Sequence, residues 1–204
     1  MSAVSQWFSQ YWMYALGIPL AIAVFAVVLK MAVKSYKSYY KRYRSEEKEI
    51  TRLLGLKEKY GALTAEAIGS GDENELLEGV ALSYQLKLQK SEHMVDDFNQ
   101  LGDEKKYVYA LDVFVSDGDV KTFFSENGKE LTEIIVPAFK MIGLSEEAEK
   151  INNLRLMYDE KDETVNFDPN VIKNVQQYIV DNGILTKIKL NGAKYIKENA
   201  DLFL

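Results

Sequence analysis

The fold is decided by residues 109–151, which read YALDVFVSDGDVKTFFSENGKELTEIIVPAFKMIGLSEEAEKI. Apolar side chains recur there every three or four residues, a spacing that places them on one face of a helix. One such face, from residue 107 to 115, ends at the turn-forming residues 117–119. A second apolar stripe, from residue 131 to 142, ends at Gly143, and glycine commonly follows the last residue of a helix. The stretch therefore predicts consecutive helices joined by tight turns.

The same helical spacing continues on both sides of this stretch. Residues 76–88 and 145–158 each carry an apolar stripe, and Asp168 and Pro169 suit the cap and the first position of another helix. Residues 184–204 alternate at first, but their later apolar spacing favours a helix. Since no strand and helix alternation appears, we expect one compact multi-helix soluble domain.

The N-terminal part of the chain is very different in composition. Residues 11–29, YWMYALGIPLAIAVFAVVL, contain no charged side chain, and with residues 31–33 they are long enough to cross about 30 Å of hydrocarbon as a helix. The pattern predicts a single transmembrane helix over 11–33, between a short extracytoplasmic segment, 1–10, and a basic juxtamembrane helix, 34–60. The membrane-interface residues of this prediction are Trp12, Lys30, Lys34, Lys37, Lys41, Arg42 and Arg44.

The orientation of the predicted membrane helix follows from its flanking charges. No Lys or Arg precedes the apolar run, whereas six basic residues follow it before Ser45. The positive-inside rule then places the N-terminus outside and the acidic helical domain, residues 61–204, in the cytoplasm of a bacterial-type inner membrane. A cleaved signal peptide is the alternative, but the positive n-region that it requires is missing. The predicted fold class is thus all-α, with an N-terminal single transmembrane helix followed by the compact helical domain.

The charge beyond residue 44 is strongly acidic. It comprises 31 acidic and 19 basic side chains, a net charge of −12. A domain of this charge attracts basic proteins and repels nucleic acid, so direct nucleic-acid binding is not expected. Solubility alone is the other explanation of such a charge.

Residue types that carry catalysis are scarce. The chain has no cysteine and one histidine, His93, which excludes thiolate chemistry and paired-histidine metal sites. Nucleotide-binding and hydrolase motifs are absent as well. We therefore expect no enzyme, no cofactor and no metal. Paired carboxylates can bind basic partners or hard cations, and the candidate binding residues are Asp117, Asp119, Glu146, Glu147, Asp159 and Glu160.

Residues 109–151 resemble the DNA-mimic protein family whose prototype is a nineteen-kilodalton acidic protein, a domain of unknown function in many of its members. The likeness lies in a turn, an aromatic pair, an Asn-x-x-Gly-like element and a helix that ends in Ile-Gly; with the closing helix near Tyr195 it covers roughly residues 103–204. The family turn carries Asn and a second Gly where this chain has Asp117 and Asp119. The matching residues, which we interpret as core and turn determinants, are Gly118, Phe123, Phe124, Asn127, Gly128 and Gly143.

The resemblance implies an all-helical, non-catalytic fold whose carboxylates imitate DNA phosphates. With the charge, it gives the leading functional hypothesis: a membrane-anchored acidic interaction module that binds a basic protein and sequesters a DNA-binding partner. The expected partners are the lipid bilayer and this basic protein, and the oligomeric state stays open. Two alternatives remain at this stage, an immunity-type protein that neutralises a toxin and a carboxylate-based metal enzyme around Asp117 and Asp119.

Overall fold

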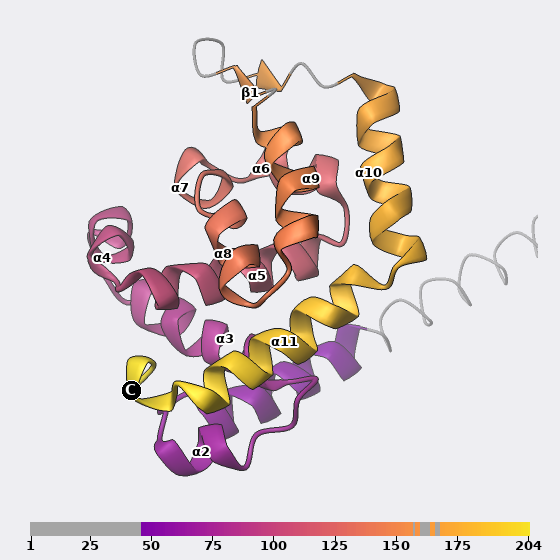
Figure 1. Ribbon diagram of the computed structural model, residues 1–204. Coiled ribbons are helices and arrows are strands. Elements are labelled where there is room, and N and C mark those ends of the chain that lie inside the picture. The colour runs from indigo at the N-terminus through magenta and orange to yellow at the C-terminus, as the bar shows by residue number, and fades with distance from the viewer. Residues whose placement is uncertain (1–45, 157, 160–163, 166–167) are drawn as a thin grey trace, which may run out of the picture. The chain divides into compact units, whose positions relative to one another are not determined.

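The computed structural model describes residues 46–156, 158–159, 164–165 and 168–204. The chain divides into two compact units, Met1–Leu53 and Leu54–Leu204. Of the first unit, the described residues 46–53 are helical. The architecture that follows is that of the second unit (Figure 1).

The second unit is built from short helices. It opens with helical residues 54–60. Most of its helices span between one and four turns, and α5 (Asp103–Asp117) and α11 (Ile184–Glu198), with 15 residues each, are the longest of α2 to α11. In chain order the helices are α2 (Ala65–Gly69), α3 (Leu76–Leu88), α4 (Met94–Gln100), α5 (Asp103–Asp117), α6 (Val120–Glu126), α7 (Lys129–Thr132), α8 (Ile135–Met141), α9 (Ser145–Arg155), α10 (Pro169–Asp181), α11 (Ile184–Glu198) and the 3-10 turn η1 (Ala200–Leu202).

The all-α part of the predicted fold class is confirmed. The described strands are two residues long each: β1 (Tyr158–Asp159) pairs antiparallel with β2 (Thr164–Val165) between α9 and α10. Residue 158 lies opposite 165, and 159 opposite 164. This pairing joins two helices and takes no part in a larger sheet within the described residues.

The membrane part of the predicted fold class requires a correction. Within residues 46–156, 158–159, 164–165 and 168–204, no helix combines the length and apolar character needed to cross a bilayer. A span needs about 20 apolar residues, whereas α5 and α11 stop at 15 and carry charged side chains. The expectation of a single-pass membrane protein is therefore not supported. The segment on which it rested, 11–33, and its seven interface residues lie outside the described residues.

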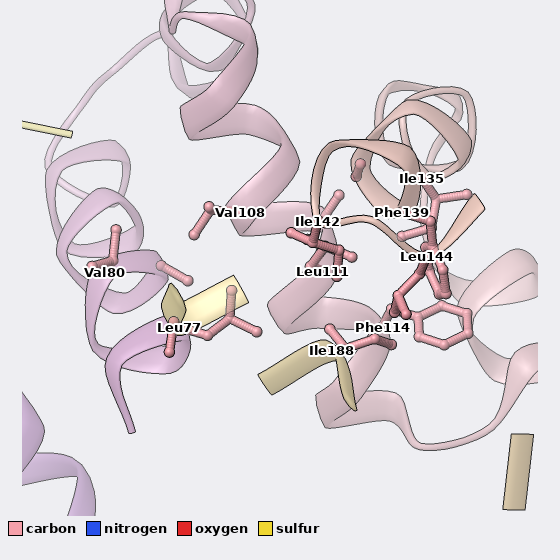
Figure 2. Close-up of a cluster of buried hydrophobic side chains, with 14 of the residues drawn as sticks. Leu77, Val80, Val108, Leu111, Phe114, Ile135, Phe139, Ile142, Leu144 and Ile188 are labelled. Carbon is pink, nitrogen blue, oxygen red and sulfur yellow. The ribbon is translucent and has the colours of Figure 1, made fainter. Parts of the chain in front are cut away.

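Helix α5 occupies the centre of the core. Its buried residues include Val108, Leu111 and Phe114. Figure 2 shows these side chains between Leu77 and Val80 of α3 on one side and the apolar residues of α8 on the other. Ile188 of α11 joins the same cluster. A helix with neighbours on several sides needs a broad apolar surface, which explains the dense apolar spacing seen in the sequence.

Four phenylalanines hold α5, α6 and α8 together. The Phe114 ring lies edge-on to Phe123, with 5.1 Å between ring centroids, and to Phe139, with 5.3 Å. Phe123 packs in the same manner on Phe124 at 5.3 Å. All four side chains are buried, so the prediction that Phe123 and Phe124 are core residues is confirmed. Edge-to-face pairs of this kind add about 1 kcal/mol each beyond the burial of apolar area.

Helices α10 and α11 begin where their sequences indicate. Asp168 caps α10 by accepting a hydrogen bond from the Asn170 amide at 2.8 Å, and Pro169 occupies the first turn. Gly183, with φ of +60°, takes the left-handed conformation that separates the two helices. The locally alternating start of α11 is helical because Ile184 and Ile188 both point into the core.

The last residues close over α3. Phe203 is buried, and its carbonyl accepts a hydrogen bond of 3.0 Å from the hydroxyl of the buried Tyr84. The Tyr84 ring also lies 5.7 Å and 5.8 Å from the ammonium groups of Lys87 and Lys105. Burial raises the pKa of the Tyr84 hydroxyl above its ordinary value of 10.0. The neutral phenol is therefore the form that the fold stabilises.

Substitution of Tyr84 by Phe tests this contact. At neutral pH the variant should lose about 1 kcal/mol of unfolding free energy, because the hydrogen bond to Phe203 is removed. As the pH rises through 10, ionisation of Tyr84 favours the unfolded wild type and has no counterpart in Tyr84→Phe. The stability difference should shrink there. Urea unfolding of both proteins at neutral and alkaline pH measures it, and a difference that grows with pH contradicts the assignment.

Two helical glycines provide a matched test of packing. A Cβ added at Gly79 of α3 would overlap the ring of the buried Tyr60, whereas one added at Gly55 meets nothing within 4 Å. Gly79→Ala should therefore destabilise the fold by about 2 kcal/mol despite its better helix propensity. Gly55→Ala should leave stability unchanged or raise it by up to about 1 kcal/mol. Chemical denaturation distinguishes the two, and equal effects would contradict this packing.

Candidate acidic interaction site

The predicted acidic turn lies where α5 meets α6. Helix α5 ends at Asp117, and Gly118 follows with φ of +64°, a left-handed conformation that glycine adopts at little cost. The next residue, Asp119, is the N-cap of α6. The sequence Asp-Gly-Asp therefore ends one helix and begins the next within three residues.

Both carboxylates of this turn are engaged inside the protein. Asp119 accepts hydrogen bonds from the amide and the hydroxyl of Thr122, at 3.0 Å and 2.9 Å. Asp117 accepts a bond of 2.8 Å from the side-chain amide of Asn127, which also donates to the carbonyl of Phe123 at 2.9 Å. Asp117, Asp119 and Asn127 are all half-buried. These carboxylates thus help to fix the α5–α6–α7 connection, each through one of its two oxygens, Oδ2.

A glutamine from α10 braces the same turn. The side-chain oxygen of Gln176 accepts a bond of 3.0 Å from the Val120 amide, and its nitrogen donates to the Gly118 carbonyl at 3.1 Å. One side chain therefore satisfies a donor and an acceptor on either side of Asp119. This amide contact joins α10 to the start of α6 and sets the position of α10 beside the turn.

The second predicted acidic pair begins α9. Glu146 is exposed, whereas Glu147 is 9% exposed. Both lie in the first turn, where the helix dipole favours negative charge. Tyr178 of α10 lies close to them: partial burial raises the pKa of its hydroxyl, and the carboxylates of Glu147 and Glu146 raise it further. The Lys150 ammonium lies 4.5 Å from the Tyr178 ring centre. Only Glu146 of this pair is freely available at the surface.

The six predicted binding residues therefore do not act as one set. Asp117 and Asp119 share the α5–α6 turn, and Glu146 and Glu147 share the start of α9. Helix α10 touches both places, through Gln176 at the turn and Tyr178 at α9. The side chain of Asp159 and all of Glu160 lie outside the described residues.

The predicted motif residues are turn and core residues. Gly118 and Gly143 both have positive φ, and Gly128 is the N-cap of α7. At Gly143 the Leu144 amide bonds back to the Phe139 carbonyl at 2.9 Å, which closes α8 by a Schellman turn. The role predicted for Gly143 is confirmed.

Potential metal ligands were sought in the described part of the chain. No group of three His, Cys, Asp or Glu side chains there could hold a metal ion. The carboxylates at 117 and 119 accept hydrogen bonds from protein donors instead. His93 is exposed at the start of α4. The described residues therefore bring no third His, Cys, Asp or Glu ligand to this turn.

Gln176, Lys150 and Tyr178 were missed by sequence reasoning. Gln176 lies 58 residues from the Gly118 carbonyl that it bonds, and a glutamine in an amphipathic helix carries no local signal of such a contact. The neighbourhood of Tyr178 and the carboxylates of α9 comes from tertiary packing, which no local pattern in the sequence indicates.

No protein-family model, curated protein or solved structure matches this chain. The resemblance of residues 103–204 to the DNA-mimic family stays a prediction.

Two adjacent glutamines test the brace on the turn. Gln176→Ala should lower the unfolding free energy by about 1–2 kcal/mol, because a part-buried donor and acceptor lose their partner. Gln177→Ala removes an exposed bond to Asp181 and should cost less than about 0.5 kcal/mol. Urea unfolding of the two variants provides the comparison. Equal losses would show that Gln176 does not support the turn.

Proposed function

We propose that this chain is a non-catalytic, acidic protein-interaction module that binds a basic protein partner. The observation that carries the proposal is the set of exposed carboxylates that no cation of the described residues neutralises. The resemblance to the DNA-mimic family supports a DNA-binding protein as that partner.

The surface carboxylates divide into paired and unpaired groups. Glu133, Glu149 and Glu198 lie within 4 Å of lysine ammonium groups. Glu126, Glu130 and Glu146 are exposed and have no ion pair among the described residues. An unpaired surface carboxylate presents its full negative charge to a partner. In an exposed ion pair the lysine offsets part of that charge, and the pair stabilises the fold by less than about 1 kcal/mol.

The structure changes which carboxylates are proposed to bind. The sequence indicated the turn at Asp117 and Asp119, but both side chains hold the turn together. Glu147 is almost fully covered. Of the six residues predicted from sequence, Glu146 is the one whose described side chain is exposed and unpaired. Partner contacts are therefore assigned to Glu146 and to similar carboxylates such as Glu126 and Glu130.

Competition with DNA has a simple electrostatic basis. Duplex DNA carries one negative charge per roughly 1.7 Å of axis, and proteins that bind it use clusters of Lys and Arg. The part of this chain beyond residue 44, with a net charge of −12, offers the same sign of charge. Binding of this kind weakens steeply with salt, since charges at a wet interface are screened over about 8–10 Å.

Affinity capture with the full-length chain tests the proposal. The immobilised protein is exposed to native lysate, washed through a salt gradient, and its ligands are identified by mass spectrometry. We expect a basic protein that elutes at moderate salt and is displaced by added duplex DNA. Capture that does not respond to salt, or a partner that DNA fails to displace, contradicts binding through DNA-like charge.

Charge-neutral variants connect the captured protein to the surface. Glu126→Gln, Glu130→Gln and Glu146→Gln together should weaken binding by at least about fivefold, because three unpaired charges are removed. The control removes the same charge where carboxylates are already paired, by Glu133→Gln, Glu149→Gln and Glu198→Gln. A control that weakens binding equally would assign the effect to net charge alone.

A further inference from the structure

An open groove of about 520 Å³ runs between α10 and the start of α6. Its lining residues come mainly from one helix: Pro169, Ile172, Lys173, Gln176, Gln177 and Val180 of α10, with Asp119 and Lys121 opposite. Figure 1 shows α10 at the edge of the unit.

The α10 residues follow the spacing of a helix-packing seam. They recur at steps of three, one, three, one and three residues, which is the pattern of positions that one helix presents to a second helix lying alongside it. From Pro169 to Val180 this seam extends along about 16 Å of helix axis. The lining contributed by α10 is therefore long enough for about three turns of another helix.

The groove floor is apolar and already ordered. Val180 is 63% exposed, and Pro169 is exposed as well. Ile172 packs partly against the core. Gln176 cannot rotate away without losing both of its bonds to the α5–α6 turn. An apolar partner would thus cover exposed carbon without reorganising the site, which favours binding.

Two of the three charged side chains that line the groove are lysines, whereas the chain beyond residue 44 is negative overall. Lys121 and Lys173 are exposed and have no ion pair among the described residues. The third, Asp119, keeps its negative charge and accepts two hydrogen bonds from Thr122, and the neighbouring Asp181 accepts one from Gln177. Asp168, next to Pro169, caps α10. The two lysines are the lining charges that remain without a partner, and they favour carboxylates beside the apolar floor.

We propose that this groove binds an amphipathic helix of a protein partner. The helix is about three turns long, places aliphatic side chains at heptad spacing over Ile172 and Val180, and places Glu or Asp against Lys121 and Lys173. This is a second interaction site, distinct from the carboxylate surface assigned to a basic partner, and it selects ligands of the opposite charge.

Two synthetic peptides test the groove with the full-length, isotope-labelled chain. The first is a capped helical peptide of about 15 residues with leucines at heptad spacing and flanking glutamates. The second carries lysines in place of the glutamates. In amide-resolved NMR titrations we expect the glutamate peptide to shift the resonances of Lys121, Ile172, Lys173 and Val180. The lysine peptide should bind this groove at least about fivefold more weakly.

Matched charge reversals locate the binding. Lys121→Glu with Lys173→Glu should weaken the glutamate peptide at least about fivefold and strengthen the lysine peptide. The control, Lys90→Glu with Lys187→Glu, makes the same change in net charge at exposed positions outside the groove and should leave both peptides unchanged.

Several results would overturn the proposal. They are shifts that map elsewhere on the chain, no shift at all, equal affinity for the two peptides, and equal loss in the groove and control variants. The last measurement is sedimentation of the protein alone. If the protein self-associates and only the groove variant abolishes this, the groove binds a second copy of the chain and the proposal is contradicted. Because the proposed basic partner should not bind the groove, failure here leaves the function proposed above untouched.

Discussion

The burial of α5 is the constraint on which the rest of the unit depends. Its apolar residues cover too much of the helix circumference to be shielded by one neighbour, so α3, α8 and α11 pack around it (Figure 2). The chain leaves the end of α5 at Gly118 and turns sharply into α6. That turn carries two carboxylates, and they are tolerated because Thr122 and Asn127 donate hydrogen bonds to them. The carboxylates of Asp117 and Asp119 therefore stabilise the turn that follows the buried helix α5.

Local physical rules account for most of the elements. Apolar spacing located the helices around Phe114 and Phe139, and the cap at Asp168 and the close of α8 at Gly143 follow from chemistry within a few residues. Such features depend on neighbours in sequence, which makes them readable without a structure. The single membrane-spanning helix expected from composition has no counterpart among the described helices.

The site could be anticipated much less well, since its features depend on contacts between distant segments. No local pattern announces that Gln176 will bond Gly118, or that the start of α9 will lie beside Tyr178. Nor does charge alone separate Glu146, which is exposed, from Glu147, which is covered. The number of acidic and basic residues sets the net charge. Binding depends on which carboxylates lie at the surface without an ion pair or a hydrogen bond inside the protein.

The bond between Tyr84 and Phe203 joins residues 119 apart. Most of that separation is already closed by α11, which packs on α3 and α5. Only the few residues after Glu198 remain to be placed, so the bond and the buried Phe203 ring act on a short segment. The entropy cost of closing a short segment is small, and one hydrogen bond together with one buried ring is therefore enough to hold the end of the chain against α3.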